Sequence, residues 1–286
     1  MRVLAASALA LCGLAAASCG GAAANSERVA APVAAQPSAS AAPSSAPAAS
    51  PAAGSAAPTA DRPLEGRTIV IDPGHNGGNH KNPKAINRQV NVLTQWKACD
   101  TTGTSTNDGY SEAAFTWDVS QRLTKILKAR GATVKLTRAD NTGVGPCITE
   151  RAAIGNKAKA DAAISVHADG SAAGNRGFHV IIPKKINGPV DPVVNDSRRL
   201  GVAVRDAFRK GTGLPYSTYI GSKALSFRND LGGLNLSTVP KIFIESGNMR
   251  NAGEGRQVQG RRLQAAHRSV AGGRFAKLPE VTSFPA

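Results

Sequence analysis

Aromatic residues are scarce in this chain of 286 residues, where Phe, Trp and Tyr together make up 4%. So few rings argue against the stacking platforms with which many proteins bind single-stranded nucleic acid. The net charge is +16, yet no run of five or six consecutive Lys or Arg residues occurs. The positive charge is therefore spread over the surface, where it serves either solubility or binding to an anionic polymer.

Long apolar runs are also lacking, apart from one near the N-terminus. Met1 and Arg2 precede an apolar stretch over 3–17, which is too short to span a membrane and is typical of a signal peptide. We therefore expect a signal peptide over 1–19 and an exported protein, which argues further against nucleic acid as a partner. The segment Ala16-Ala17-Ser18-Cys19 resembles a lipobox, although Ala16 stands where that pattern prefers Leu. Cys19 is thus a candidate for lipidation and membrane anchoring, with cleavage and release as the alternative.

Residues 20–61 consist almost only of Ala, Pro, Ser and Gly. Such a segment has no large apolar side chains to offset the loss of chain entropy, so we expect a disordered, semi-stiff linker. The folded domain is expected over 62–286, which is long enough for one domain with a substantial core.

Cysteine is scarce as well, because only Cys99 and Cys147 of the four cysteines lie in the expected domain. Two cysteines in an exported domain usually form a disulfide. The alternative is a metal ligand or a nucleophile, but neither cysteine has a CxxC or His neighbour.

Apolar, β-branched segments alternate with segments of helical periodicity along the domain. This alternation predicts an α/β fold with a sheet flanked by helices on both faces. Residues 76–110 lack periodicity and are expected to form a long functional loop. Strands are expected at 68–72, 133–137, 162–166, 177–182 and 241–245, and helices at 111–131, 148–160, 197–210 and 256–270.

Chemically active side chains follow these expected strands. His75 comes after the first strand, His167 after the third, and Glu245 ends the last one. Ligands of α/β sheets bind beyond the carboxyl ends of the strands, so these side chains should converge at one edge. Two imidazoles and a carboxylate are a typical zinc set, and Glu112, at the start of a helix, could complete it. Taken singly, each histidine could equally be an ordinary loop residue, and Glu112 a first-turn carboxylate that favours the helix dipole.

Glu245 follows a buried apolar strand, where a carboxylate is costly without a partner or a task. It could be hydrogen-bonded to loop amides, or it could act as a general base toward an attacking water.

Several blocks of the chain resemble, in order, those of the N-acetylmuramoyl-L-alanine amidases of the Amidase_3 type, especially the short secreted members from mycobacteria. The resemblance covers essentially all of residues 66–275. The segment Ile69 to Gly77 is similar to the block containing DPGHGG, and Ser165 to Asp169 is similar to the S-[IVL]-H-A-[ND] block. The remaining matching blocks are 145–151, 228–234 and 239–248.

This resemblance implies a zinc-dependent hydrolase of the amide bond between N-acetylmuramic acid and L-alanine in peptidoglycan. It implies one zinc ion held by His75, Glu112 and His167, with Glu245 as the catalytic acid and base. It also implies a disulfide between Cys99 and Cys147, and a mixed, mostly parallel sheet of about six strands in a single domain over 62–286.

Two further residues are candidates for contacts with the substrate. Arg228 could pair with a stem-peptide carboxylate, or it could be an ordinary salt-bridge partner. Asn76 stands where most family members have Gly, and it is the second candidate. Two other functions stay open: a zinc peptidase that cuts within the stem peptide, and a non-catalytic wall-binding protein. We expect a monomer, because no long exposed apolar stripe is evident.

Overall fold

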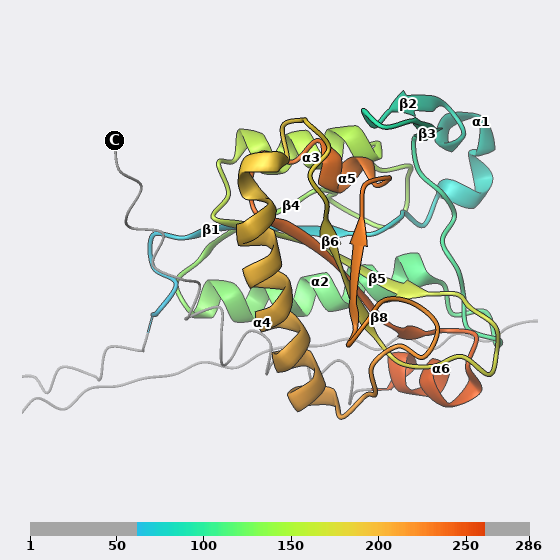
Figure 1. Ribbon diagram of the computed structural model, residues 1–286. Helices are drawn as coiled ribbons and strands as arrows, with labels where there is room; N and C mark the ends of the chain where they lie inside the picture. The colour runs from blue at the N-terminus through green and yellow to red at the C-terminus, as the bar shows by residue number, and fades with distance from the viewer. Residues whose placement is uncertain (1–61, 261–286) are drawn as a thin grey trace, which may run out of the picture. The chain divides into compact units, whose positions relative to one another are not determined.

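Figure 1 shows the computed structural model, which describes residues 62–260. The predicted signal peptide, the linker, Cys19 and the end of the helix predicted to reach residue 270 lie outside these residues. Within the described part of the chain, no helix has both the length and the apolar character needed to cross a membrane.

The centre of the domain is a mixed, mostly parallel sheet of six strands, as the family resemblance implied, and the strand order is β4-β1-β5-β8-β6-β7. Strands β4, β1, β5 and β8 run parallel to one another, whereas β6 runs antiparallel to β8 and parallel to β7. The strands are β1 (Thr68–Pro73), β4 (Thr133–Leu136), β5 (Ala162–Asp169), β6 (His179–Pro183), β7 (Leu225–Arg228) and β8 (Lys241–Asn248).

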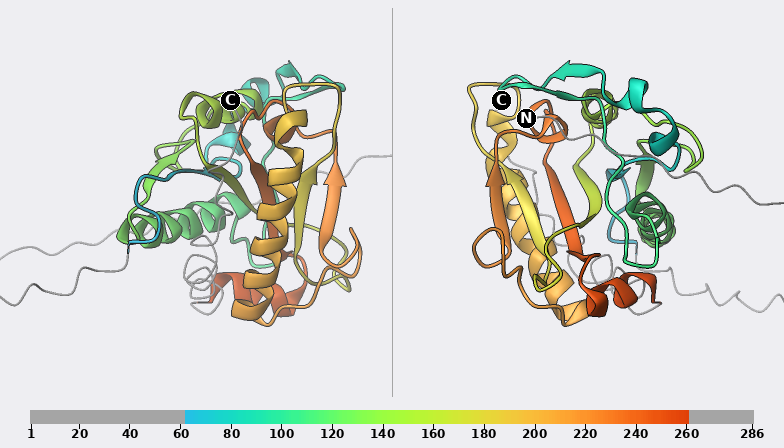
Figure 2. Two further views of the ribbon diagram at one scale, coloured as in Figure 1. Left: turned by 60° about the vertical axis from the view of Figure 1, so that its left-hand side comes forward. Right: turned by 90° about the vertical axis from the view of Figure 1, so that its right-hand side faces the viewer.

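Helices cover both faces of this sheet (Figures 1 and 2). The two long helices α2 (Glu112–Ala129) and α4 (Val194–Thr212) pack into one core cluster on the same face. On the opposite face, α3 (Ile148–Lys157) lies beside the short helix α5 (Gly232–Asn235). The last described helix, α6 (Ala252–Gln259), packs near the end of β8.

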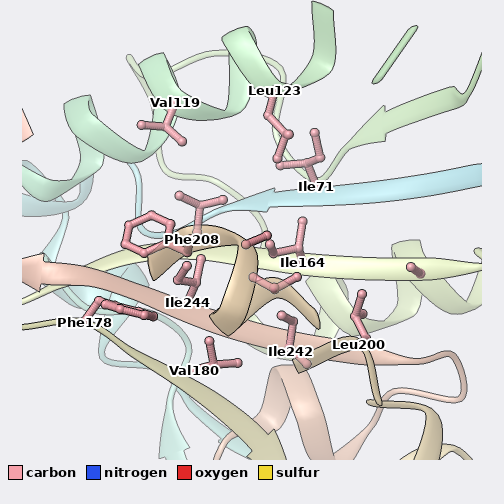
Figure 3. Close-up of a cluster of buried hydrophobic side chains, with 14 of the residues drawn as sticks. Ile71, Val119, Leu123, Ile164, Phe178, Val180, Leu200, Phe208, Ile242 and Ile244 are labelled. Carbon is pink, nitrogen blue, oxygen red and sulfur yellow. The ribbon is translucent and has the colours of Figure 1, made fainter. Parts of the chain in front are cut away.

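The main core lies between the sheet and the pair α2 and α4, as Figure 3 shows. Alternating residues of the strands point to opposite faces, so Ile69 and Ile71 enter this core while Val70 packs toward α3. In α2, apolar residues recur at a spacing of four and form one buried stripe. The buried residues of this stripe are Phe115, Val119, Leu123 and Leu127.

The prediction of a long irregular loop over 76–110 was wrong. This segment contains two short helical turns and an antiparallel pair of strands. These elements are only three or four residues long, too short for periodicity to reveal them. They are η1 (Asn79–Lys81), α1 (Pro83–Ile86), β2 (Gln89–Asn91) and β3 (Trp96–Ala98).

Other elements and boundaries also differ from the prediction, among them α5, which was not foreseen, and α4, which begins three residues before 197. Strand β7 and the turn η2 (Asp191–Val193) were not foreseen, β8 continues three residues beyond Glu245, and α6 begins four residues before the predicted start at 256. Asn251 caps α6, because its side chain accepts hydrogen bonds from the backbone N–H groups of Gly253 and Glu254.

Cys99 and Cys147 form the predicted disulfide, which ties the segment after β3 to the start of α3. We expect the double variant Cys99→Ser with Cys147→Ser to lose about 4 kcal/mol of unfolding free energy, because the bond closes a long loop in the unfolded chain. Urea unfolding of the oxidised parent and of the variant measures this difference. An unchanged midpoint and slope would contradict it.

Candidate metal and catalytic site

The structure brings His75, Glu112 and His167 together beyond the end of β1. The three ligand atoms that these residues offer lie within 4.8 Å of one another, and no other such group occurs in residues 62–260. His75 Nε2 is 3.2 Å from Glu112 Oε1, and His167 Nδ1 is 2.9 Å from the same oxygen. The predicted cluster is therefore present, built from a loop, a helix start and a strand.

Local backbone structure aims each of these side chains. His75 adopts a left-handed conformation with φ of 58°, which costs a non-glycine residue about 1–3 kcal/mol. Gly74 must be glycine, since a Cβ there would lie 2.2 Å from His167 Cε1. Ser111 caps α2 by accepting a hydrogen bond from Ala114 N–H, and so fixes where Glu112 begins the helix.

The donor set suits zinc. Ligands about 2.0–2.1 Å from a tetrahedral zinc ion stand roughly 3.3 Å from one another. Glu112 Oε1 lies at similar distances, 3.2 and 2.9 Å, from the facing nitrogens of the two imidazoles. The carbonyl of Thr101 accepts a hydrogen bond from the Nδ1–H group of His75 at 3.1 Å, and the Nε2 atom of the same ring faces Glu112. The backbone N–H groups of Thr104 and Ala168 donate to the two oxygens of Glu112 and hold its carboxylate in place.

The charges of the cluster support one another. Burial by itself would lower the pKa of His75, but Glu112 and Asp100 outweigh burial and raise that pKa well above its ordinary value. Burial would likewise raise the pKa of Glu112, but His75 and His167 bring it well below the ordinary range. The site is therefore an anionic carboxylate facing two imidazoles, an arrangement suited to a cation.

Glu245 lies within β8, opposite His167 of β5 and His179 of β6 in the sheet register. The prediction that it ends its strand was wrong, because β8 continues to Asn248. Its Oε2 atom is buried and has no hydrogen-bond partner among the described residues. Burial, together with Glu112 and Asp169, raises the pKa of Glu245 well above its ordinary value.

A cavity of about 370 Å³ connects Glu245 with the cluster. His75, Glu112 and His167 line this cavity together with Glu245, Asp169 and Arg228. Glu245 therefore shares one space with all three candidate ligands. A second, mostly apolar cavity of about 160 Å³ lies against the same two histidines and is walled by Phe243, Ile148 and Leu231.

The two residues predicted to contact substrate are held by other residues of the chain. Arg228 forms a two-point pair with Asp230, at 2.7 and 2.6 Å, but its side chain also lines the larger cavity. Asn76 is buried, donates to the carbonyl of Gly143 and accepts from Arg138. These bonds favour a structural role for Asn76, whereas Arg228 has both a structural partner and access to the cavity.

Other residues around the site were not predicted. Phe243 stacks on the His167 ring with centroids 5.1 Å apart, and Tyr219 donates a hydrogen bond to Asp169 at 2.9 Å. Phe243 precedes Glu245 by two residues and so shares its face of the sheet, a signal that strand alternation could have supplied. Tyr219 lies far from Asp169 in sequence, and no local pattern indicates this contact.

His179 is fully buried beside Glu245, and burial lowers its pKa to about 4, with Arg228 acting in the same direction and Asp169 against it. The unfolded chain therefore binds this proton more readily than the folded chain. Stability should fall by up to roughly 3 kcal/mol as the pH drops from 6.5 to 4.

The variant His179→Gln should lack this part of the pH dependence. Urea unfolding of the variant and of the parent across that pH range gives the difference in unfolding free energy. Asp169, Glu245 and Tyr219 face position 179 in both proteins, so this difference reports the histidine alone. Parallel curves for the two proteins would show that His179 is not the titrating group.

The fold and the site together define an α/β protein with a hydrolase-like cluster of two histidines and two glutamates at one edge of the sheet. The sequence profile of the Amidase_3 family, described as N-acetylmuramoyl-L-alanine amidase, matches residues 69–273. The chain belongs to this family.

Individual proteins agree with this assignment. The N-acetylmuramoyl-L-alanine amidase Rv3717 of Mycobacterium tuberculosis is 39% identical over 219 residues, which is 73% of this chain and 87% of that protein. The crystal structure of the amidase Ami1 of Mycobacterium smegmatis is similar with a TM-score of 0.69 and 35% identity, covering 75% of this chain and 97% of that one. Ami1 of Mycobacterium abscessus gives a TM-score of 0.67 and 38% identity, with coverage of 75% and 100%.

Proposed function

We propose that this protein is a zinc-dependent amidase that hydrolyses the bond between N-acetylmuramic acid and L-alanine in peptidoglycan. One observation carries the proposal: a buried oxygen of Glu245, unpartnered within residues 62–260, shares a cavity with the cluster of His75, Glu112 and His167. Membership of the amidase family and the mycobacterial relatives support the choice of bond.

His75, Glu112 and His167 would hold the metal. Two neutral imidazoles and one carboxylate leave a divalent cation with a net positive charge. When bound, zinc would act as a Lewis acid toward a water molecule and toward the scissile carbonyl. Thr101, Thr104 and Ala168 keep the ligands in orientation through the hydrogen bonds described above.

Glu245 would move the proton. Its carboxylate accepts a proton from the attacking water and then donates it to the departing amine of L-alanine. Burial raises the pKa of Glu245, which makes its carboxylate a stronger base toward the proton of the attacking water. The burial that raises the pKa of Glu245 is thus part of its proposed function.

The substrate and the location follow from the same proposal. Peptidoglycan lies outside the cytoplasmic membrane, so the protein would be exported through the signal at 1–19 and act in the cell envelope as a monomer. Lipidation of Cys19 would anchor it to the membrane, and the linker over 20–61 would let the domain reach the wall. The intact mass of the mature protein tests lipidation directly, since a diacylglyceryl group on Cys19 adds a mass that Cys19→Ser cannot carry.

Mass spectrometry of sacculi digested by the purified protein distinguishes the three candidate functions. Release of intact stem peptides that begin with L-alanine is the expected result. Shorter peptides would instead identify a peptidase acting within the stem, and tight binding without products would identify a wall-binding protein. Either of these two results contradicts the proposal.

A further inference from the structure

Arg151 of α3 has a buried guanidinium group, 4% exposed, that binds the backbone of the turn carrying the candidate ligand His75. It donates to the carbonyl of Pro73 at 2.7 Å and to the carbonyl of His75 at 3.0 Å. These two carbonyl groups belong to the residues on either side of Gly74, so one planar guanidinium group binds both sides of the turn after β1.

The backbone at His75 needs such a hold, because its left-handed conformation is one that a histidine rarely adopts. Release of the turn would let the residue return to an ordinary conformation, and the imidazole would then leave Glu112. Arg138, which lies two residues beyond the end of β4, supports the turn as well, because it donates to the same Pro73 carbonyl at 3.0 Å. Arg151, however, is the arginine that reaches the His75 carbonyl.

The same guanidinium also fixes a carboxylate beside the His75 ring. Asp100 Oδ2 lies 3.2 Å from Arg151 Nη2, and Asp100 Oδ1 lies 3.3 Å from His75 Nδ1. The other side of the guanidinium group pairs with Asp72 at 2.9 Å, which in turn holds the buried Lys241. Arg151 is therefore connected both to the backbone of His75 and, through Asp100, to its ring.

The disulfide lies directly beside this connection. Asp100 follows Cys99, and Arg151 lies one helical turn after Cys147, whose carbonyl accepts the Arg151 backbone N–H. The covalent bond and the ion pair thus join the same two segments side by side. Either one alone would restrain the distance between Asp100 and α3.

We propose that Arg151 is a positioning residue for the metal ligand His75, acting through the carbonyls of the turn and through Asp100, with the disulfide keeping Asp100 in register. This inference rests on the proposed function, since it takes His75 to bind zinc. A carboxylate or carbonyl behind a ligating imidazole fixes the ring and its tautomer, and its loss commonly weakens metal binding by a factor of about 10–100.

The test compares zinc affinities of full-chain variants by competition with a chromophoric chelator. Arg151→Lys keeps the charge but loses the planar guanidinium group, and Asp100→Asn keeps the shape but loses the charge. We expect each to raise the dissociation constant for zinc about 10–100-fold. Matched controls are Arg67→Lys and Asp161→Asn, which alter an ion pair of 3.0 Å at the opposite end of β1 and should change the constant less than about twofold.

The thermal midpoint of the zinc-free proteins separates positioning from simple core stability. A lowered midpoint with an unchanged zinc affinity in Arg151→Lys and Asp100→Asn would overturn the proposal. If Arg151→Lys does not fold, Asp100→Asn decides, because it leaves Arg151 and its pair with Asp72 in place. Failure of the parent to bind zinc would instead refute the proposed metal site itself, and the positioning role with it.

Discussion

Glu245→Gln should bind zinc as tightly as the parent and hydrolyse peptidoglycan about 100- to 10,000-fold more slowly. The amide has nearly the shape of the carboxylate, so the fold and the metal ligands are preserved. It cannot accept the proton of the attacking water or return it to the leaving amine. Release of L-alanyl stem peptides, measured at matched zinc occupancy, gives the ratio of rates.

Two controls make this result specific. Glu65→Gln changes an exposed glutamate that pairs with Arg62 on the surface, and its activity should match that of the parent. Metal content measured on every sample excludes loss of zinc as the cause. A Glu245→Gln protein that turns over substrate within threefold of the parent would show that another group moves the proton.

Glu112→Gln should lose zinc binding, although it keeps Glu245, the residue proposed to transfer the proton. One oxygen of Glu112 faces both imidazoles, at 2.9 and 3.2 Å, and both oxygens accept backbone N–H bonds. A carboxamide removes the negative charge and turns an NH₂ group toward an N–H donor. We expect the dissociation constant for zinc to rise more than about 100-fold. This is more than the loss of a residue that only orients a ligand usually causes, because Glu112 is itself a proposed ligand.

The pair of variants separates the two roles. Glu245→Gln should retain zinc without activity, whereas Glu112→Gln should lack both at zinc concentrations that saturate the parent. Chelator competition and hydrolysis, measured on the same preparations, give the two readouts. Full zinc affinity in Glu112→Gln would remove this residue from the ligand set.

The long elements could be predicted because their side-chain patterns are strong. The β-branched run of β1 specifies a buried strand directly. In α2, apolar residues at every fourth position specify an amphipathic helix. The parallel core of the sheet follows from their alternation. Strand β7, with four residues of mixed burial, carries no comparable pattern, and β2 and β3 are shorter still.

The ligand set could be predicted only in part from physical reasoning. Strand ends placed His75, His167 and Glu245 at one edge, and the family blocks then gave Glu112 and Glu245 their expected roles as ligand and as catalytic acid and base. Local sequence cannot show that Arg151 meets Asp100, because 51 residues separate them. Nor can it show the left-handed turn at His75, which depends on the surrounding carbonyl bonds.

The two candidates for substrate contacts stay predictions, although the structure shows which residues of the chain hold them. Asn76 was expected to contact substrate, yet its amide is engaged by Arg138 and Gly143 inside the protein. For Arg228, the sequence left open both a salt bridge and a substrate contact. The structure shows the salt bridge with Asp230, and the side chain also lines the cavity. The partners of Asn76 lie 62 and 67 residues away in the sequence, which no local pattern reveals, whereas Asp230 lies only two residues from Arg228.

Stepwise return of zinc to the metal-free protein tests the central claim most directly. Release of L-alanyl stem peptides should be absent at first, rise in proportion to added zinc, and level off at one ion per chain. Activity that persists without metal, or that Glu112→Gln shows to the same extent, would contradict the account of the site.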